Sequence, residues 1–183
     1  AKDLVGKYFS EKAKEIAHAD YKGGDKLIPW SIEGEFVGAD LLDIKYKQLF
    51  PYVTSEELEK DAFRVIPGDY VTTEDGTGIV HIAPTFGADD KRVCDLAGIP
   101  GVIVKDKKGD DAPLVDKRGC FVKEVTDFAD EPVKAEYLDE IPDGYKNVDV
   151  RIAIKLKEEN RAFDVKKYEH SYPHCWRTDK PVL

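Results

Sequence analysis

The chain has 183 residues, with 28 Lys and Arg against 37 Asp and Glu, which gives a formal net charge of −9. Its hydrophobic share of 42% is too large for a disordered chain, and no apolar run approaches the ~20 residues that cross a bilayer. The three cysteines, Cys94, Cys120 and Cys175, are too widely spaced for a disulfide framework. We therefore expect a globular protein of a reducing, cytoplasmic compartment, without signal peptide or membrane contact.

The first third of the chain predicts one helix followed by short strands. Apolar side chains recur at helical spacing over residues 3–19, and Gly23-Gly24 ends that pattern. Residues 27–50 alternate apolar and polar side chains between Pro and Gly, which predicts short strands separated by turns. Ser55 heads a run of Glu, so residues 55–60 predict one helical turn.

A strand followed by a helix is predicted in the middle of the chain. Residues 76–83, with the sequence GTGIVHIA, form the clearest predicted strand, and Pro84 stops it. Residues 87–97 predict a short helix that begins with two acidic residues and ends before Gly98. Gly76 and Gly78, at the start of this segment, are poor evidence for a phosphate loop, because the glycines of a dinucleotide fingerprint come after a strand.

The last third predicts further short strands and one long helix. Strands are expected near residues 102–104, 114–115 and 163–168, and residues 147–160 carry apolar side chains at helical spacing. Many short strands with few helices predict a mainly β fold over residues 1–183, closed or barrel-like with peripheral helices; an α+β sandwich is the alternative. The first residue is not Met and the last three are apolar, so we expect a piece of a larger protein.

Two side chains of the middle segment could carry chemistry. His81 lies near the end of the predicted strand, where a side chain can face a cleft, although a hydrogen-bonded core histidine is the more common case. Asp90 lies in the first turn of the predicted helix, where a carboxylate interacts favourably with the helix dipole. Alternatively, Asp90 pairs with a cation such as a substrate ammonium.

The C-terminal segment offers two further chemistries. His170, His174 and Cys175 could bind a metal, but the fourth ligand of a structural zinc site is absent at position 178, which is Thr, so no metal is expected. Aromatic and basic side chains could instead stack on and pair with a nucleotide: Tyr172, Trp176 and Arg177. Residues 146–180 hold nine Lys or Arg against six Asp or Glu. This basic segment is either a solvated face or a local contact for a polyanion.

Three stretches together resemble the isoleucyl-tRNA synthetases, class I enzymes with an editing domain inserted into the catalytic domain. GTGIVHIAPTFGADD at residues 76–90 resembles the hydrolytic-pocket peptide of that domain. HSYPHCWRTDKPVL at residues 170–183 resembles the strand that returns to the catalytic domain, and EFVGADLLDIKYKQLFPY at residues 35–52 is similar to a third stretch.

The resemblance implies that this chain is an editing-domain fragment that hydrolyses valine wrongly esterified to isoleucine tRNA. Asp90 would then be the catalytic-site carboxylate that holds the substrate ammonium, with His81 and Phe86 as further substrate-binding residues. The implied partners are the acceptor end of the tRNA and the rest of the synthetase, whose ATP and Mg²⁺ are not expected in this fragment. A tRNA-contacting module without catalysis remains the alternative.

Two departures from the family pattern affect these expectations. The family also uses a threonine-rich peptide of the type T-T-x-P-W-T, and Thr72-Thr73 does not match it. The fragment alone is therefore expected to be a weak or inactive deacylase. Thr178 stands where some relatives have Cys, which argues against an inherited zinc site.

Overall fold

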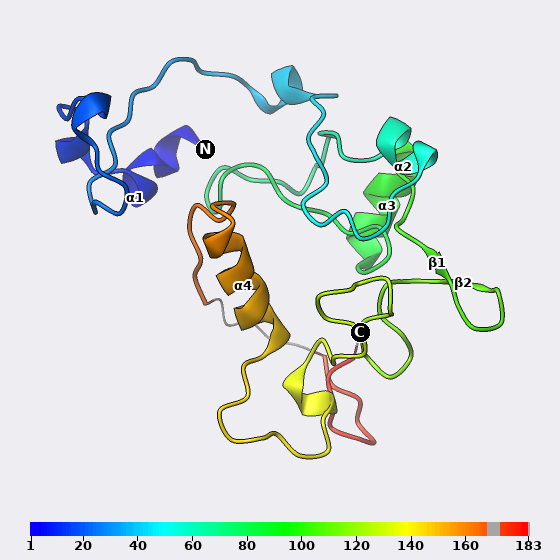
Figure 1. Cartoon of the computed structure of the whole chain (residues 1–183). Helices are drawn as coiled ribbons and strands as arrows, with labels where there is room; N and C mark the ends of the chain where they lie inside the picture. The colour runs from blue at the N-terminus through cyan, green and yellow to red at the C-terminus, as the bar shows by residue number, and fades with distance from the viewer. Residues whose placement is uncertain (168–172, 183) are drawn as a thin grey trace. The chain divides into compact units, whose positions relative to one another are not determined.

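The computed structural model describes residues 1–167 and 173–182, and their regular elements are mostly short helices (Figure 1). The α-helices are α1 (Val5–Tyr8), α2 (Glu56–Asp61), α3 (Ala88–Ala97) and α4 (Val148–Glu158). Strands β1 (Val104–Lys105) and β2 (Asp111–Ala112) pair antiparallel, with Val104 opposite Ala112. The 3-10 helices cover Lys2–Leu4, Glu11–Ala13, His18–Asp20, Gly38–Leu41 and Ala135–Tyr137.

The predicted mainly β, barrel-like fold is wrong. Among the described residues, pairing is limited to one two-stranded sheet and four isolated bridges: Lys45 with Arg64, Val115 with Phe121, Cys120 with Pro132, and His174 with Pro181. The clearest predicted strand, 76–83, has no strand partner in this part of the chain. Its alternating pattern is compatible with extended backbone, but a strand requires a neighbour to accept its hydrogen bonds.

The helix predictions were more successful toward the end of the chain. α2, α3 and α4 lie where helices were expected, and Ser55 Oγ accepts a hydrogen bond from the Leu58 amide at 3.1 Å, as a helix cap does. The predicted helix over 3–19 is instead broken into short turns, because Phe9 is extended with φ −126° and ψ 130°. Residues 163–167, the described part of the last predicted strand, form none.

The chain divides into two compact units. The first comprises residues 1–48 and 59–100, and the second comprises residues 49–58 and 101–183. In the first unit, α3 buries Val93 and Cys94. Its C-terminus is held by Arg64, which donates to the Ala97 carbonyl at 2.7 Å and forms an ion pair with Asp43 at 2.9 Å. These contacts fix the C-terminal end of α3, the helix that follows the loop at residues 83–87.

The second unit packs around a small apolar core. Val125, Phe128 and Val148 are buried, and partly buried side chains surround them: Tyr52, Leu114, Phe121, Val122 and Ile152. Val148 belongs to α4, so the apolar face of this helix supplies part of the core, as its sequence spacing predicted.

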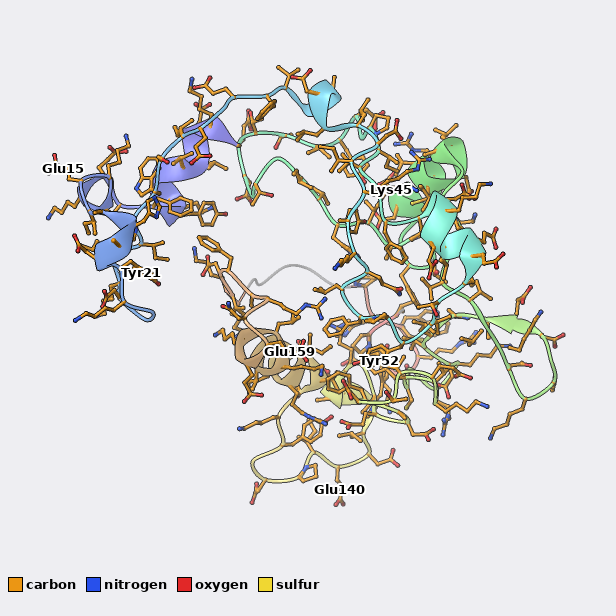
Figure 2. The ribbon with its side chains drawn as sticks, turned by 45° about the horizontal axis from the view of Figure 1, so that its top comes forward. Glu15, Tyr21, Lys45, Tyr52, Glu140 and Glu159 are labelled. Carbon is orange, nitrogen blue, oxygen red and sulfur yellow. The ribbon has the colours of Figure 1, made fainter. Side chains whose placement is uncertain are left out.

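Polar contacts border this core on the same face of α4, because Lys155 follows Val148 by about two helical turns (Figure 2 labels Tyr52 and Glu159). Tyr52 donates to Asp127 at 2.7 Å, and Lys155 bridges Asp127 at 3.0 Å and Glu159 at 2.6 Å. Burial and the bond to Asp127 raise the pKa of Tyr52 to about 12, while the bonds from Tyr52 and Lys155 lower that of Asp127. All four groups therefore keep their ordinary ionisation state at neutral pH, and none is poised to exchange a proton.

Candidate functional site

A closed loop between residues 83 and 90 holds the acidic residue singled out from the sequence. The Phe86 amide donates to the Ala83 carbonyl at 2.9 Å, which closes a turn with Pro84 at its second position, where proline is favoured. Asp90 lies in the first turn of α3, and its Oδ2 accepts a hydrogen bond from the Ala83 amide at 2.9 Å. One carboxylate thus ties the start of the helix to the residue where the extended segment ends.

The Asp90 carboxylate is partly buried and has no cationic partner among residues 1–167 and 173–182. Its neighbour Asp89 differs, because its side chain is 85% exposed and lies 4.0 Å from the Arg92 guanidinium. A hydrogen-bonded carboxylate without a counter-ion can bind an added cation such as an ammonium group. Of these two adjacent acids, Asp90 is the one suited to a ligand.

Burial and the Asp90 charge both act on a thiol inside the same helix. Cys94 lies one turn after Asp90 and is fully buried, and burial first, then the charge of Asp90, raises the pKa of its thiol. Burial followed by the Asp90 charge also raises the pKa of Tyr70. The raised pKa values keep both groups neutral at pH 7, so neither places a second negative charge beside Asp90.

The other predicted substrate-binding residues are more open. His81 is exposed, and Phe86, inside the closed turn, has 39% of its surface exposed. His81 precedes Ala83 by two residues, so the segment that carries it is the one bonded to Asp90. A common pocket for these side chains stays a prediction.

A shallow hollow of about 420 Å³ lies elsewhere in the first unit. Apolar side chains of α3 and of the segment after Phe63 line it, together with two ion pairs, Arg64–Asp43 and Arg92–Asp69. Neither His81 nor Asp90 is among its lining residues. Both arginines already have carboxylate partners, so the hollow lacks an unpaired charge that would select a ligand.

Residues 173–182 form a hairpin that carries two of the three predicted RNA-binding side chains, Trp176 and Arg177. His174 and Pro181 pair, the Cys175 amide donates to the Lys180 carbonyl at 2.9 Å, and the Val182 amide donates to Pro173 at 2.9 Å. At its tip, Trp176 is 85% exposed and the Arg177 guanidinium lies 4.7 Å from the indole centroid. An exposed indole with a stacked guanidinium is a suitable platform for an unpaired base.

The base of this hairpin is anchored to the rest of the second unit. Tyr137 donates its hydroxyl hydrogen to the Pro181 carbonyl at 2.7 Å. The Tyr137 ring packs directly on Gly119, where an added Cβ would lie 2.6 Å from the ring carbons. Sequence reasoning missed this anchor, since a lone Tyr and a lone Gly 18 positions apart give no spacing signal.

Two sequence predictions concern residues on which the structure gives no information. Tyr172, the third predicted RNA-binding residue, and His170, a candidate metal ligand, lie outside the described residues. Within the described part of the chain, no cluster of three or more His, Cys, Asp or Glu could hold a metal. In that same part, no helix has the length and apolar character to cross a membrane.

Comparison with known proteins extends over the whole chain. No protein-family model matches it. The isoleucine–tRNA ligase of Cytophaga hutchinsonii is 62% identical over all of this chain, which corresponds to 17% of that relative. The isoleucine–tRNA ligases of Bacteroides fragilis and Bacteroides thetaiotaomicron are 47% and 44% identical, again over the full chain and over 17% and 19% of their own length. The chain belongs to the isoleucine–tRNA ligase family and spans less than a fifth of the length of the curated relatives that it matches.

Proposed function

We propose that this chain is the part of an isoleucine–tRNA ligase that hydrolyses valine wrongly esterified to isoleucine tRNA. The match to ligases of that name over the full chain supports the parent reaction, the ATP-dependent attachment of isoleucine to its tRNA. The resemblance of residues 76–90 to an editing peptide supports the hydrolytic role.

A hydrolytic correction has a clear physical purpose in such an enzyme. Valine and isoleucine differ by one methylene, which is worth only about 1–3 kcal/mol in a hydrophobic pocket, a limit for which isoleucine–tRNA ligases are themselves the standard example. A first binding step therefore admits some valine. A second pocket too small for isoleucine removes it by hydrolysis.

The observation that carries this proposal is the state of the Asp90 carboxylate. Its Oδ2 is fixed by the Ala83 amide, and it lacks a cationic partner in the described residues. Its remaining acceptor capacity suits the α-ammonium of an aminoacyl ester. His81 and Phe86, near it in the chain, would contact the amino-acid side chain.

The chemical step requires little acid–base assistance from the protein. Water attacks the ester carbonyl carbon, the bond to the ribose oxygen breaks, and a proton from the water passes to that oxygen. The products are free valine and a tRNA with its terminal hydroxyl restored. Holding the ammonium places the carbonyl for attack, so Asp90 contributes by orientation.

The test compares two adjacent carboxylates in the full-length ligase. Asp90→Ala should lower deacylation of valyl-tRNA by about 100-fold or more, because a misplaced ester is attacked slowly, while isoleucine attachment continues. Asp89→Ala is the matched control and should leave deacylation near its normal rate. Normal deacylation by the Asp90→Ala enzyme would contradict the proposal.

A second function has its own observation in its favour. The exposed Trp176–Arg177 pair favours direct contact with an unpaired nucleotide at the tRNA acceptor end. This contact is compatible with hydrolysis, and it would stand alone if Asp90 proves dispensable.

A further inference from the structure

Gly87 has a backbone conformation that other residues rarely adopt. Its φ is +114° and its ψ is +125°, in a region that is accessible almost exclusively to glycine. Gly87 is also the residue immediately before α3, and its carbonyl accepts the Lys91 amide at 3.0 Å in the first turn. The direction in which α3 leaves the closed turn therefore depends on this one peptide.

Gly87 also lies directly against the Asp90 carboxylate. A Cβ added at Gly87 would lie 3.4 Å from Asp90 Cγ and 3.5 Å from Oδ2. These are contact distances without overlap, so a methyl group would fit beside the carboxylate. Any residue other than glycine, alanine included, is strained at this backbone angle, and relief of the strain rotates the peptide that starts the helix.

We infer that Gly87 is a positioning residue for the ammonium-binding carboxylate. This inference rests on the proposed function. With glycine at 87, the chain turns sharply enough for Asp90 to reach back to the Ala83 amide, which leaves the carboxylate in one orientation. A residue that relaxes to negative φ moves the start of α3 and with it the Asp90 oxygens.

The consequence is specific to substrates that carry an ammonium group. Gly87→Ala should slow deacylation of valyl-tRNA by about tenfold or more, as expected for a small misplacement of a positioning group. The matching ester of the 2-hydroxy analogue of valine has no ammonium, and its slower hydrolysis should change little. General damage to the fold would slow both esters alike, so the ratio of the two rates reports the position of the carboxylate.

The experiment uses the full-length ligase with Gly98→Ala as the matched control. Gly98 ends α3 with φ +66°, and an added Cβ there would meet no atom within 4 Å. Gly98→Ala therefore strains the same helix at its other end without touching Asp90, and it should keep the normal ratio of rates. A normal ratio in the Gly87→Ala enzyme would overturn the inference.

Two additional measurements separate the possible failures. If Gly87→Ala also loses isoleucine attachment, Asp90→Glu addresses the same geometry without changing the turn, since its extra methylene displaces the charge; a normal ratio in that enzyme would overturn the inference. A fall of about 100-fold in deacylation by Asp90→Ala, together with a normal ratio in Gly87→Ala, would refute only the role of Gly87. Normal deacylation in Asp90→Ala would refute the proposed function itself.

Discussion

The loop at residues 83–90 and the hairpin at residues 173–182 present their functional side chains in opposite ways. Asp90 points back into its own loop and is fixed by the Ala83 amide. Trp176 points away from its hairpin and is 85% exposed, while main-chain bonds and the Tyr137 anchor hold the hairpin below it. The first arrangement suits a small charged group in one position, and the second suits a flat base that tolerates several positions.

This difference predicts where substitutions are felt. A change near Asp90 acts on orientation and should appear in the rate of a reaction. A change near Trp176 acts on contact area and should appear in affinity, and a change at the Tyr137 anchor should appear first in stability.

The largest expected effect in the hairpin region concerns Gly119. An added Cβ would lie 2.6 Å from the Tyr137 ring, so Gly119→Ala must displace that ring and weaken its bond to the Pro181 carbonyl. Gly109→Ala is the matched control, because φ is +86° at Gly109 and +77° at Gly119, but no atom lies within 4 Å of a Cβ at 109. We expect Gly119→Ala to lower the free energy of unfolding by about 1–3 kcal/mol more than the control, measured by urea denaturation. Equal losses would show that Tyr137 does not anchor the hairpin.

The next effect concerns affinity for RNA. Trp176→Ala should weaken binding of a single-stranded RNA oligonucleotide with the tRNA 3′-terminal sequence by about 1–3 kcal/mol, since it removes a stacking surface. Trp176→Phe keeps a ring and should retain most of the affinity. Because the side chain is 85% exposed, neither change should alter the unfolding midpoint. Fluorescence anisotropy on the full-length ligase at several salt concentrations measures the effect, and equal affinities of the three proteins would exclude stacking at this tip.

The same two regions show what the sequence could and could not predict. α3 and α4 were predicted within two residues because acidic residues in a first turn, the glycine at 98 and apolar spacing are local signals. The segment 76–83 was predicted as a strand because its pattern alternates, but pairing depends on a neighbour that no local pattern specifies. The barrel-like fold was inferred from such segments and fails for the same reason.

The candidate site divides along the same line. Asp90 was identified from its place in the first helical turn and from the family resemblance. Its hydrogen bond to the Ala83 amide could be recognised only from the backbone structure of the turn. The unusual φ and ψ of Gly87 also became visible only in the structure, since glycine is common in any loop. The Gly119–Tyr137–Pro181 contact joins residues far apart in sequence and could only be seen in the structure.

The smallest effect uses cysteines as reporters of the two regions. Burial, followed by the Asp90 charge, raises the pKa of Cys94, whereas hydrogen bonds from Thr178 and from the Arg177 and Thr178 amides lower that of Cys175. The thiolate is the reactive form, so at pH 8 Cys175 should react with iodoacetamide faster than Cys94. Thr178→Val removes the hydroxyl donor, so the pH midpoint of the Cys175 reaction should rise toward that of an ordinary thiol while the Cys94 rate stays the same. Mass spectrometry of the alkylated peptides over pH 6–10 measures both rates. Faster labelling of Cys94 would contradict the contrast between a thiol buried in α3 near the Asp90 carboxylate and a hairpin thiol that accepts hydrogen bonds.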